Sequence, residues 1–404
     1  KPEVRRRKTG DRCQTPEVRR LFLPSNVACI GILKTMGFDR RLVQYFDWGL
    51  MLIILLLGAI GLVALYSAVT AGADIAQKIL FAKQLIWYSA GLVAMVVSFL
   101  FSYKLLEKWA DIIYGGCVFL LVSVLIFGKV TGGSQRWLLL GPISVQPSEI
   151  AKVAVIIVLA RYYSKYASER GFSFRELITP MILTAIPFIL IVKQPDLGTA
   201  MVILLIAATM TFFVKIERRT LLYVLSFGVL SGPLVWHFLK GYQKQRILTF
   251  LNPDRDPLGT GYHIIQSKIG IGSGHISGRG FLQGTQNALS FLPEQHTDFI
   301  FSVLAEEWGF VGASVLLLMF LFLVVWGLNI AANCRDNFGT ILAVGITMLI
   351  MWQVLINIGM VMGLMPVVGV TLPFISYGGS SIVTMMICAG ILLNISMRRF
   401  QFEK

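Results

Sequence analysis

A series of long apolar runs constrains the fold of this 404-residue chain more than any other feature. Each run holds about 18 residues or more, which is enough for a helix to cross the hydrocarbon core of a membrane. Inside lipid, a helix satisfies its own backbone hydrogen bonds. The sequence therefore predicts an all-α polytopic membrane protein, with one domain over residues 36–404 and about ten transmembrane helices at 46–70, 81–103, 110–130, 149–166, 178–194, 196–214, 219–240, 299–331, 338–364 and 374–396.

Composition supports a membrane protein and argues against other classes. The chain is 56% hydrophobic and only 14% charged, whereas a soluble domain carries about 25% charged residues. Its net charge of +15 is spread over short loops and the amino-terminal tail, so it does not indicate nucleic-acid binding. The five cysteines form no CxxC pair, which argues against a zinc site or a disulfide framework.

The amino-terminal tail, residues 1–35, is basic and lacks apolar periodicity. It predicts a disordered extension that can contact anionic lipid head groups. The sequence from Met36 onward resembles a natural amino terminus. We therefore interpret 1–35 as an extension upstream of the membrane domain.

Lys and Arg in the short loops predict the orientation in the membrane. They occur in alternate loops, at 104–108, 161–175, 215–219, 335 and 398–399, and in the amino-terminal tail. Loops of this kind face the cytoplasm. With ten spans, both termini are then cytoplasmic, and the long loop 241–298 between the seventh and eighth spans faces outward.

The long loop ends on the polar stretch Pro293-Glu-Gln-His296-Thr297-Asp298, which runs directly into the apolar residues of the eighth span. Two interpretations of Asp298 fit this position. It is either the N-cap of the following helix, because Asp accepts backbone N–H bonds there, or a catalytic carboxylate at the membrane edge.

The rest of this loop mixes charged residues with glycines. Its basic side chains suit an anionic head group, since Arg and Lys bind phosphate through charge-assisted bonds; a solvated loop of mixed charge is the alternative. The glycines between 270 and 280 fit neither a dinucleotide-binding motif nor a Walker A loop. We interpret them as turns or as sites of close helix approach.

Another polar cluster is predicted on the outward side, before and within the fourth span. Arg136 and Trp137 are adjacent in a loop, where Trp can anchor the chain at the membrane interface. Ser148 is expected to cap the helix that follows. Glu149 and Lys152 lie three residues apart on that helix, so they can form an ion pair on one face.

Two further clusters contain polar residues near the ends of spans. In the turn Lys193-Gln-Pro-Asp196, Asp196 either caps the next helix or contacts a ligand. Gln353 and Asn357 lie on one helical face, ahead of the Ser- and Gly-rich segment 376–381. We interpret this last cluster as a site of close helix packing.

Several long stretches of this chain resemble one family. They are GSQRWLLLGPISVQPSEIAK, KQPDLGTA, FLPEQHTDFIFSVLAEEWG and GLMPVVGVTLPFISYGGSS. They are similar to the SEDS proteins of bacterial cell-wall growth, and most closely to the RodA branch that serves cell elongation. The resemblance spans roughly 38–399 and does not cover 1–35.

The resemblance implies a peptidoglycan glycosyltransferase that polymerises lipid II on the outer face of the bacterial cytoplasmic membrane. It also implies a class B penicillin-binding protein, the elongation transpeptidase, as a partner, together with other membrane proteins of the elongation complex. The chain itself has no S-x-x-K motif for a transpeptidase serine. The carboxylate that is essential in the family corresponds to Asp298.

This activity suggests a mechanism. A β-1,4 glycan made from an α-linked donor requires inversion, which fits one direct displacement with Asp298 as the general base, its pKa raised by the membrane edge. A divalent cation, Mg²⁺ or Mn²⁺, can assist the leaving pyrophosphate, and no organic cofactor is expected. The candidate substrate-binding residues are Arg136, Trp137, Glu149, Lys152, Lys193, Asp196, Arg246, Gln266, Lys268, His296 and Thr297.

Two other functions stay open at this point. The intramembrane charges Glu149, Lys152 and Asp196 also suit a lipid II flippase or transporter. A scaffold that only recruits the transpeptidase would leave Asp298 replaceable. The polymerase is favoured because the signature charges gather on one membrane face and the chain shows no inverted repeat of the kind common in transporters.

Overall fold

The computed structural model describes residues 46–70, 75–131, 134–140, 143–166, 171–217, 219–223, 226, 237, 241–252, 259–288 and 296–398. The chain divides into two units, Lys1–Gln44 and Tyr45–Lys404. Every described residue belongs to the second unit. The prediction for 1–35 lies outside the described residues.

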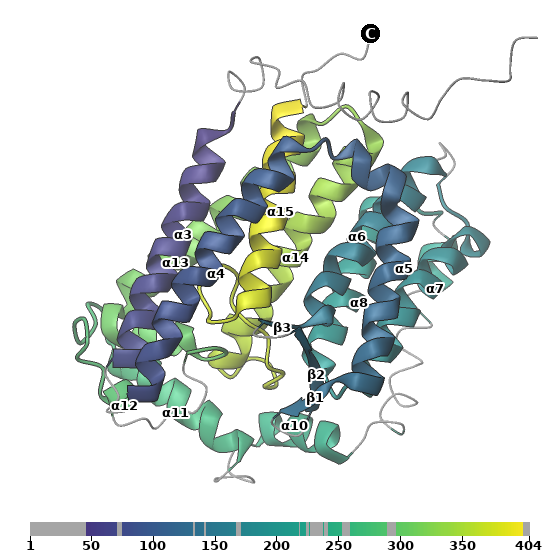
Figure 1. Ribbon diagram of the computed structural model, residues 1–404. Helices are drawn as coiled ribbons and strands as arrows, with labels where there is room; N and C mark the ends of the chain where they lie inside the picture. The colour runs from purple at the N-terminus through teal and green to yellow at the C-terminus, as the bar shows by residue number, and fades with distance from the viewer. Residues whose placement is uncertain are drawn as a thin grey trace, which may run out of the picture. The chain divides into compact units, whose positions relative to one another are not determined.

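Long apolar helices dominate the described chain, so the predicted class, a polytopic helical membrane protein, is confirmed (Figure 1). The predicted segments 149–166 and 196–214 are the helices α6 (Pro147–Lys165) and α8 (Leu197–Phe213). Most of the predicted span 219–240 lies outside the described residues. Among these residues, seven helices are long and apolar enough to cross a membrane: α3 (Trp48–Thr70), α4 (Ile75–Leu100), α5 (Lys104–Phe127), α7 (Phe174–Lys193), α13 (Ile300–Asn333), α14 (Asn337–Val361) and α15 (Gly379–Arg398).

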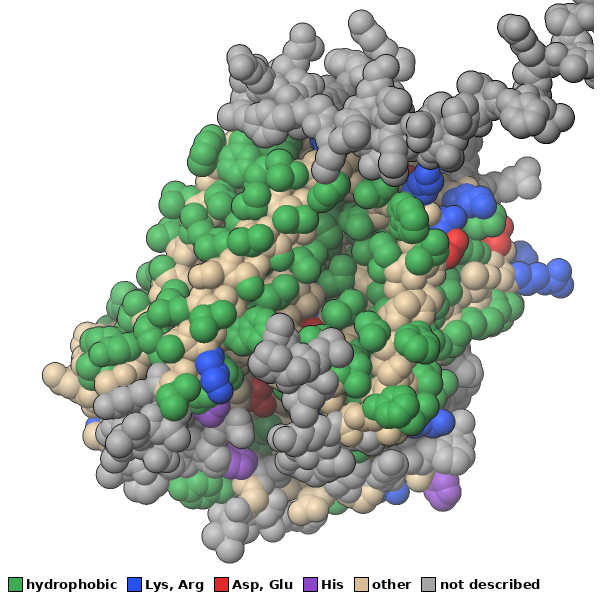
Figure 2. Space-filling model, in the orientation of Figure 1, with side chains coloured by type: hydrophobic (Ala, Val, Ile, Leu, Met, Phe, Trp, Pro, Cys, Tyr) green, Lys and Arg blue, Asp and Glu red, His purple; other side chains and the backbone are tan. Residues whose placement is uncertain are grey.

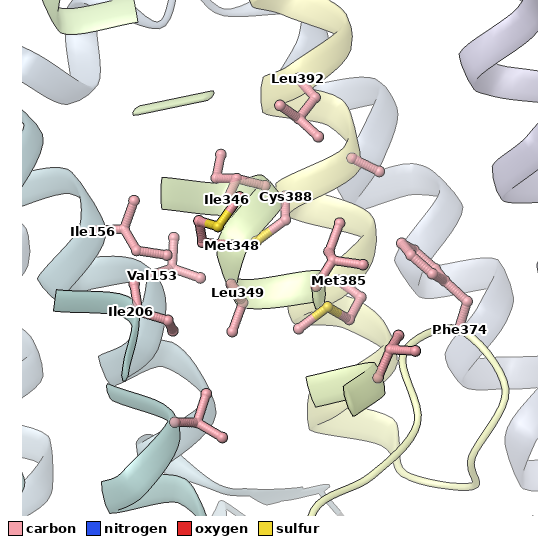
Figure 3. Close-up of a cluster of buried hydrophobic side chains, with 14 of the residues drawn as sticks. Val153, Ile156, Ile206, Ile346, Met348, Leu349, Phe374, Met385, Cys388 and Leu392 are labelled. Carbon is pink, nitrogen blue, oxygen red and sulfur yellow. The ribbon is translucent and has the colours of Figure 1, made fainter. Parts of the chain in front are cut away.

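Helices α14 and α15 form the centre of the bundle. Over the most apolar 18 residues of α14 and of α15, 78% and 83% of the residues are buried. The corresponding share in the other candidate spans is 22–39%. Helix α15 packs along α4, and α14 packs against α6, α8 and α13. Figure 3 shows the core between these helices, where Val153 of α6, Ile206 of α8, Leu349 of α14 and Met385 of α15 belong to one cluster of buried side chains.

The outer helices expose large apolar side chains. Trp48 on α3, Ile86 on α4 and Phe119 on α5 are each about 70% exposed, and hydrophobic side chains are spread over the coloured middle of the face that Figure 2 shows. A monomer in water rarely exposes so large an apolar surface. Lipid tails are as apolar as these side chains, so the same surface is favourable in a membrane.

A small antiparallel sheet, which the sequence did not predict, lies between α5 and α6. Its strands are β1 (Lys129–Thr131), β2 (Ser134–Leu140) and β3 (Ile143–Val145), in the order β1-β2-β3. Helix α5 ends at Phe127, short of the predicted residue 130, because Gly128 has an extended backbone. The strands then follow directly.

Half of the predicted loop 241–298 is helical. It contains α10 (Gly241–Leu251), α11 (Thr260–Ser273) and α12 (Thr285–Ala288), and α11 packs on α13 and α14. The predicted close approach of its glycines is confirmed at Gly274 and Gly278. A Cβ at these positions would lie 2.1 Å and 2.0 Å from carbonyl oxygens of α13.

Helices α6, α8, α13 and α15 all begin at one end of the bundle, which is drawn lowest in Figure 1. We call it the Asp298 end. The sheet and α10–α12 lie there as well (Figure 1).

Candidate functional site

Asp298 lies in the turn 296–299, immediately before α13, and is half-buried. The N-cap residue of α13 is Phe299, one position later, and its own side chain makes no capping hydrogen bond. The N-cap interpretation of Asp298 is therefore wrong by one residue. The carboxylate is placed where a solvent-accessible turn meets the membrane bundle.

The backbone around Asp298 is held by two segments far away in the sequence. The side-chain amide of Asn357 on α14 donates to the carbonyl oxygen of Asp298 at 2.9 Å and to that of Val370 at 2.7 Å. The backbone N–H of Tyr377 donates to the carbonyl oxygen of His296 at 2.9 Å. The turn that carries the carboxylate is thus fastened to the segment between α14 and α15.

Gly369 lies directly beside the carboxylate of Asp298. A Cβ on this residue would lie 3.2 Å from Oδ2 of Asp298, and its φ is +73°, a conformation that favours glycine. Nearby, the Tyr377 ring is 5.8 Å from the His296 ring, centroid to centroid. Burial raises the pKa of Tyr377, so its hydroxyl keeps its proton and can donate a hydrogen bond at neutral pH.

Glu149 and Lys152 form the predicted ion pair, with Nζ 2.8 Å from Oε1. Both side chains are buried. They line a cavity of about 40 Å³ together with Gln146, Thr199, Val202, Gln353, Gly369, Val370 and Thr371. Gly369 therefore lies between the ion pair and Asp298. The predicted cap Ser148 is wrong, because α6 has Gln146 at the N-cap and Pro147 at its first position.

Asp196 is the N-cap of α8, as one of its two interpretations predicted. Its carboxylate accepts from the backbone N–H of Thr199 at 3.3 Å and from the Thr199 hydroxyl at 2.9 Å. It also accepts from the side chain of Gln146 at 3.3 Å. Arg136 on β2 lies 3.9 Å away and donates to the carbonyl oxygen of Pro195. These contacts fasten the sheet to the α7–α8 turn.

Three helix N-termini are joined at this point. The backbone N–H of Gln146, before α6, donates to the hydroxyl of Ser380 on α15 at 3.1 Å, and the Gln146 side chain reaches the cap of α8. The N-terminus of a helix carries a partial positive charge. The joined ends of α6, α8 and α15 therefore favour an anionic group beside Arg136.

Burial divides the predicted substrate-binding residues into two groups. Glu149, Lys152 and Asp196 are buried and bonded to protein groups, which favours a structural role for them. The rest are half-buried or exposed and accessible to a ligand: Arg136, Trp137, Lys193, Arg246, Gln266, Lys268, His296 and Thr297.

Asn357 and Gly369 were not predicted from the sequence to matter to Asp298. Asn357 shares one helical face with Gln353, and that face was interpreted as a packing surface. Nothing local in the sequence connects residue 357 or 369 with residue 298. A buried amide on an apolar helix was the one available signal, because such a group has to find a hydrogen-bond partner.

The described residues contain no group of three or more His, Cys, Asp or Glu side chains that could hold a metal ion. Mg²⁺ is often bound by one or two carboxylates together with substrate phosphates. Asp298 fits such a shared site, whereas a cation held by these protein residues alone does not fit.

The fold and the site together define a polytopic helical membrane protein with a carboxylate site at one end of its bundle. The family model for the cell cycle proteins FtsW, RodA and SpoVE matches residues 47–401. The chain belongs to this family, as the resemblance predicted.

Similar proteins cover nearly the whole chain. The peptidoglycan glycosyltransferase MrdB of Escherichia coli K12 is 41% identical, with 89% of this chain and 96% of that protein aligned. The stage V sporulation protein E of Bacillus subtilis is also 41% identical, over 87% and 96%. The peptidoglycan glycosyltransferase RodA of Treponema pallidum is 33% identical, over 89% and 99%.

Solved structures share the fold. A chain from a peptidoglycan synthase complex has a TM-score of 0.75 and 33% identity, covering 88% of this chain and 99% of its own. The rod shape determining protein RodA of Thermus thermophilus has a TM-score of 0.66 and 28% identity, covering 88% and 98%.

Proposed function

We propose that this chain is a peptidoglycan glycosyltransferase that polymerises lipid II, with Asp298 as the general base. The observation that carries the proposal is the half-buried carboxylate of Asp298, held by backbone contacts in a solvent-accessible turn at the end of a membrane bundle. Relatives that align with nearly the whole chain are peptidoglycan glycosyltransferases.

The reaction joins the 4-hydroxyl of one sugar to the anomeric carbon of another. The hydroxyl oxygen forms the new bond, the bond to the lipid pyrophosphate breaks, and the configuration inverts. As the oxygen attacks, its proton passes to a carboxylate oxygen of Asp298. General-base catalysis of this kind typically contributes about 10²–10⁴-fold in rate.

The leaving pyrophosphate requires positive charge. Arg136, Arg246 and Lys268 are accessible candidates, and the joined N-termini of α6, α8 and α15 add their partial charges. Lys152 was a candidate from the sequence, but its ammonium is buried and paired with Glu149. Its charge is therefore already compensated.

Asp298 would help to hold a divalent cation, Mg²⁺ or Mn²⁺, which would neutralise charge on the leaving pyrophosphate. The described residues contain no group of three or more His, Cys, Asp or Glu side chains that could hold the cation by themselves.

The Asp298 end faces the outside of the cytoplasmic membrane, and both termini face the cytoplasm. This orientation is supported by the basic loops at the other end of the helices. A class B penicillin-binding protein is the proposed partner, alongside other membrane proteins of the elongation complex. The chain lacks a transpeptidase serine motif, and a structural relative was solved in a peptidoglycan synthase complex that couples polymerization and crosslinking.

Polymerisation of purified lipid II tests the proposal. Wild type and D298N are compared in detergent, with the partner present and penicillin added to silence crosslinking. We expect long glycans from the wild type and a loss of about 10²-fold or more in D298N, with unchanged thermal unfolding. We also expect chelation of divalent cations to slow the wild type and Mg²⁺ to restore it.

Two results would contradict the proposal. Polymer formed equally by D298N would remove Asp298 as the base. A lack of polymer from both proteins, even with the partner, would favour a lipid II transporter or a scaffold.

A further inference from the structure

We propose that Asn357 is a positioning residue, which holds Asp298 where it can accept the proton of the acceptor hydroxyl. The proposal rests on the proposed function of Asp298. It goes further in assigning a role to a residue on a different helix, 59 positions away along the chain.

Asn357 connects three segments of the molecule. It lies on α14, one of the two central helices, and its side chain is fully buried. Its amide nitrogen has two hydrogens, and the two carbonyl oxygens of Asp298 and Val370 lie 2.9 Å and 2.7 Å away. Both donors of the amide are therefore used, one on the turn before α13 and one on the segment between α14 and α15.

The two bonds restrain the carboxylate from two directions. The bond to the Asp298 carbonyl fixes the backbone from which the carboxylate extends. Val370 follows Gly369, whose Cα faces Oδ2 of Asp298 so closely that a Cβ would lie 3.2 Å from it. The bond to Val370 thus also fixes the backbone at Gly369, beside the carboxylate. One amide holds both the reacting group and the surface against which it lies.

The environment of Asn357 argues against a role in stability alone. Its Oδ1 is buried and has no hydrogen-bond partner among the described residues. A buried acceptor without a donor is costly, and a leucine of similar size would avoid that cost in an apolar helix. A polar residue at this position is explained by the need for its two donated bonds.

The effect on catalysis follows from geometry. A general base has to lie within hydrogen-bond reach of the proton it removes, and a displacement of about 1 Å can cost about 10²-fold in rate. We expect N357L to lower kcat for lipid II polymerisation by about 10²-fold, with KM for lipid II within about twofold of the wild type. Both parameters are measured in the complex with the partner, and kcat is calculated per folded protein.

Asn394 offers a matched control. It is also a fully buried Asn in a central helix, α15, and it holds backbone in the same way. Its side chain donates to the carbonyl oxygen of Phe101 at 2.8 Å and accepts from the N–H of Tyr103 at 3.0 Å, at the end of the bundle opposite Asp298. We expect N394L to lower the thermal unfolding temperature while leaving kcat per folded protein within about twofold, because Asp298 keeps its contacts.

A second readout separates positioning from general damage. If Asn357 acts through Asp298, the two substitutions affect the same step and do not multiply. N357L should then slow the residual activity of D298N by less than about twofold, although it slows the wild type about 10²-fold. A residue that only maintains the fold would lower both activities by the same factor.

N357D covers the case in which N357L does not fold. The substitution keeps the size and shape of the side chain, but a carboxyl group has at most one hydrogen to donate. At least one of the two carbonyl oxygens then loses its donor, and we expect kcat to fall in this variant too.

The outcomes distinguish the positioning role of Asn357 from the proposed role of Asp298 as the general base. Full activity of D298N would refute Asp298 as the base. An inactive D298N with fully active N357L or N357D would refute only the positioning role. So would equal losses of kcat in N357L and N394L.

Discussion

At the scale of single residues, burial separates the polar side chains of the Asp298 end by role. Asp298, His296 and Thr297 are half-buried in a turn that a substrate can reach. Glu149 and Lys152 are buried, and they line a cavity together with Gly369, the residue beside Asp298. A charge in such a place persists only when it is paired. Burial and pairing therefore favour a structural role for this ion pair.

This role predicts the behaviour of E149Q and K152M. Removing one partner of a buried pair leaves an uncompensated charge and costs about 3–5 kcal/mol, whereas replacing both partners leaves none. We expect each single variant to have a lower thermal unfolding temperature than the wild type, and the double variant to be more stable than either. If the unfolding temperature of the double variant falls by the sum of the two single decreases, the pairing is contradicted.

At the scale of secondary-structure elements, the break in α13 is the central feature. At Gly309 the backbone leaves the helical conformation, with φ +65°. In an unbroken helix the carbonyl oxygens of Glu306 and Glu307 would accept from the N–H groups of Phe310 and Val311. Here those four groups are bonded to the segment 275–280 instead.

The inserted segment provides hydrogen-bond partners for all four of these groups. The N–H groups of Arg279 and Gly280 donate to Glu306 and Glu307, both at 3.0 Å. The N–H groups of Phe310 and Val311 donate to the carbonyl oxygens of His275 and Ile276, at 2.9 Å and 3.1 Å. A helix can break inside a membrane protein when its backbone groups are satisfied in this way. The short first part of α13, which begins just after Asp298, is thereby anchored at its far end.

Side chains reinforce the same junction. Glu306 is buried and accepts from the backbone N–H of Gln286 at 3.0 Å and from the hydroxyl of Thr285 at 3.2 Å. Glu307 accepts from the hydroxyl of Ser67 on α3. Two adjacent carboxylates therefore join α13 to α12 on one side and to α3 on the other.

This arrangement makes Gly278 a sensitive position. Its φ is +82°, and a Cβ would lie 2.0 Å from the carbonyl oxygen of Glu307. A strained backbone costs about 1–3 kcal/mol and overpacking a similar amount. We expect G278A to lower the free energy of unfolding by about 2–6 kcal/mol and to reduce polymerisation, because the insertion into α13 is displaced.

Gly272 provides the control for this substitution. It lies on α11 and a Cβ there would have nothing within 4 Å. Alanine is favoured over glycine inside a helix, so G272A should be as stable as the wild type or slightly more so. Equal unfolding temperatures for G278A and G272A would show that the insertion does not stabilise α13.

At the scale of the whole molecule, the helices form a buried centre surrounded by lipid-exposed helices. Helices α14 and α15 are buried along most of their length, whereas α3, α4, α5, α7 and α13 expose wide apolar faces. Asp298 depends on the centre, because its contacts come from α14 and from the segment between α14 and α15. A carboxylate at one end of the bundle is thereby attached to its most buried helices.

The proposed orientation predicts which end a reagent outside the cell can reach. Gln283, at the Asp298 end, and Arg175, at the start of α7 and the opposite end, are both exposed. With the five natural cysteines replaced, we expect a membrane-impermeant maleimide to label Q283C in intact cells and R175C only after permeabilisation. The reverse pattern would place Asp298 in the cytoplasm and exclude polymerisation outside.

The sequence by itself determined what depends on local spacing. Apolar runs long enough to cross a membrane predicted the helices, because lipid leaves few alternatives for the backbone. The pairing of Glu149 with Lys152 and the capping by Asp196 were also predictable, since both join residues three positions apart. Ser148 was misplaced as a cap because Pro147 already takes the first helical position.

The tertiary structure alone decided how the site is assembled. The contacts of Asp298 with Asn357 and Gly369, the insertion of 275–280 into α13, and the joining of α6, α8 and α15 all connect residues distant along the chain. The sheet at 129–145 and the helices within 241–298 are short elements, whose formation depends on packing against the bundle. Contacts of this kind leave no periodic pattern in the sequence, because they are set by the three-dimensional packing of buried polar groups that must find partners.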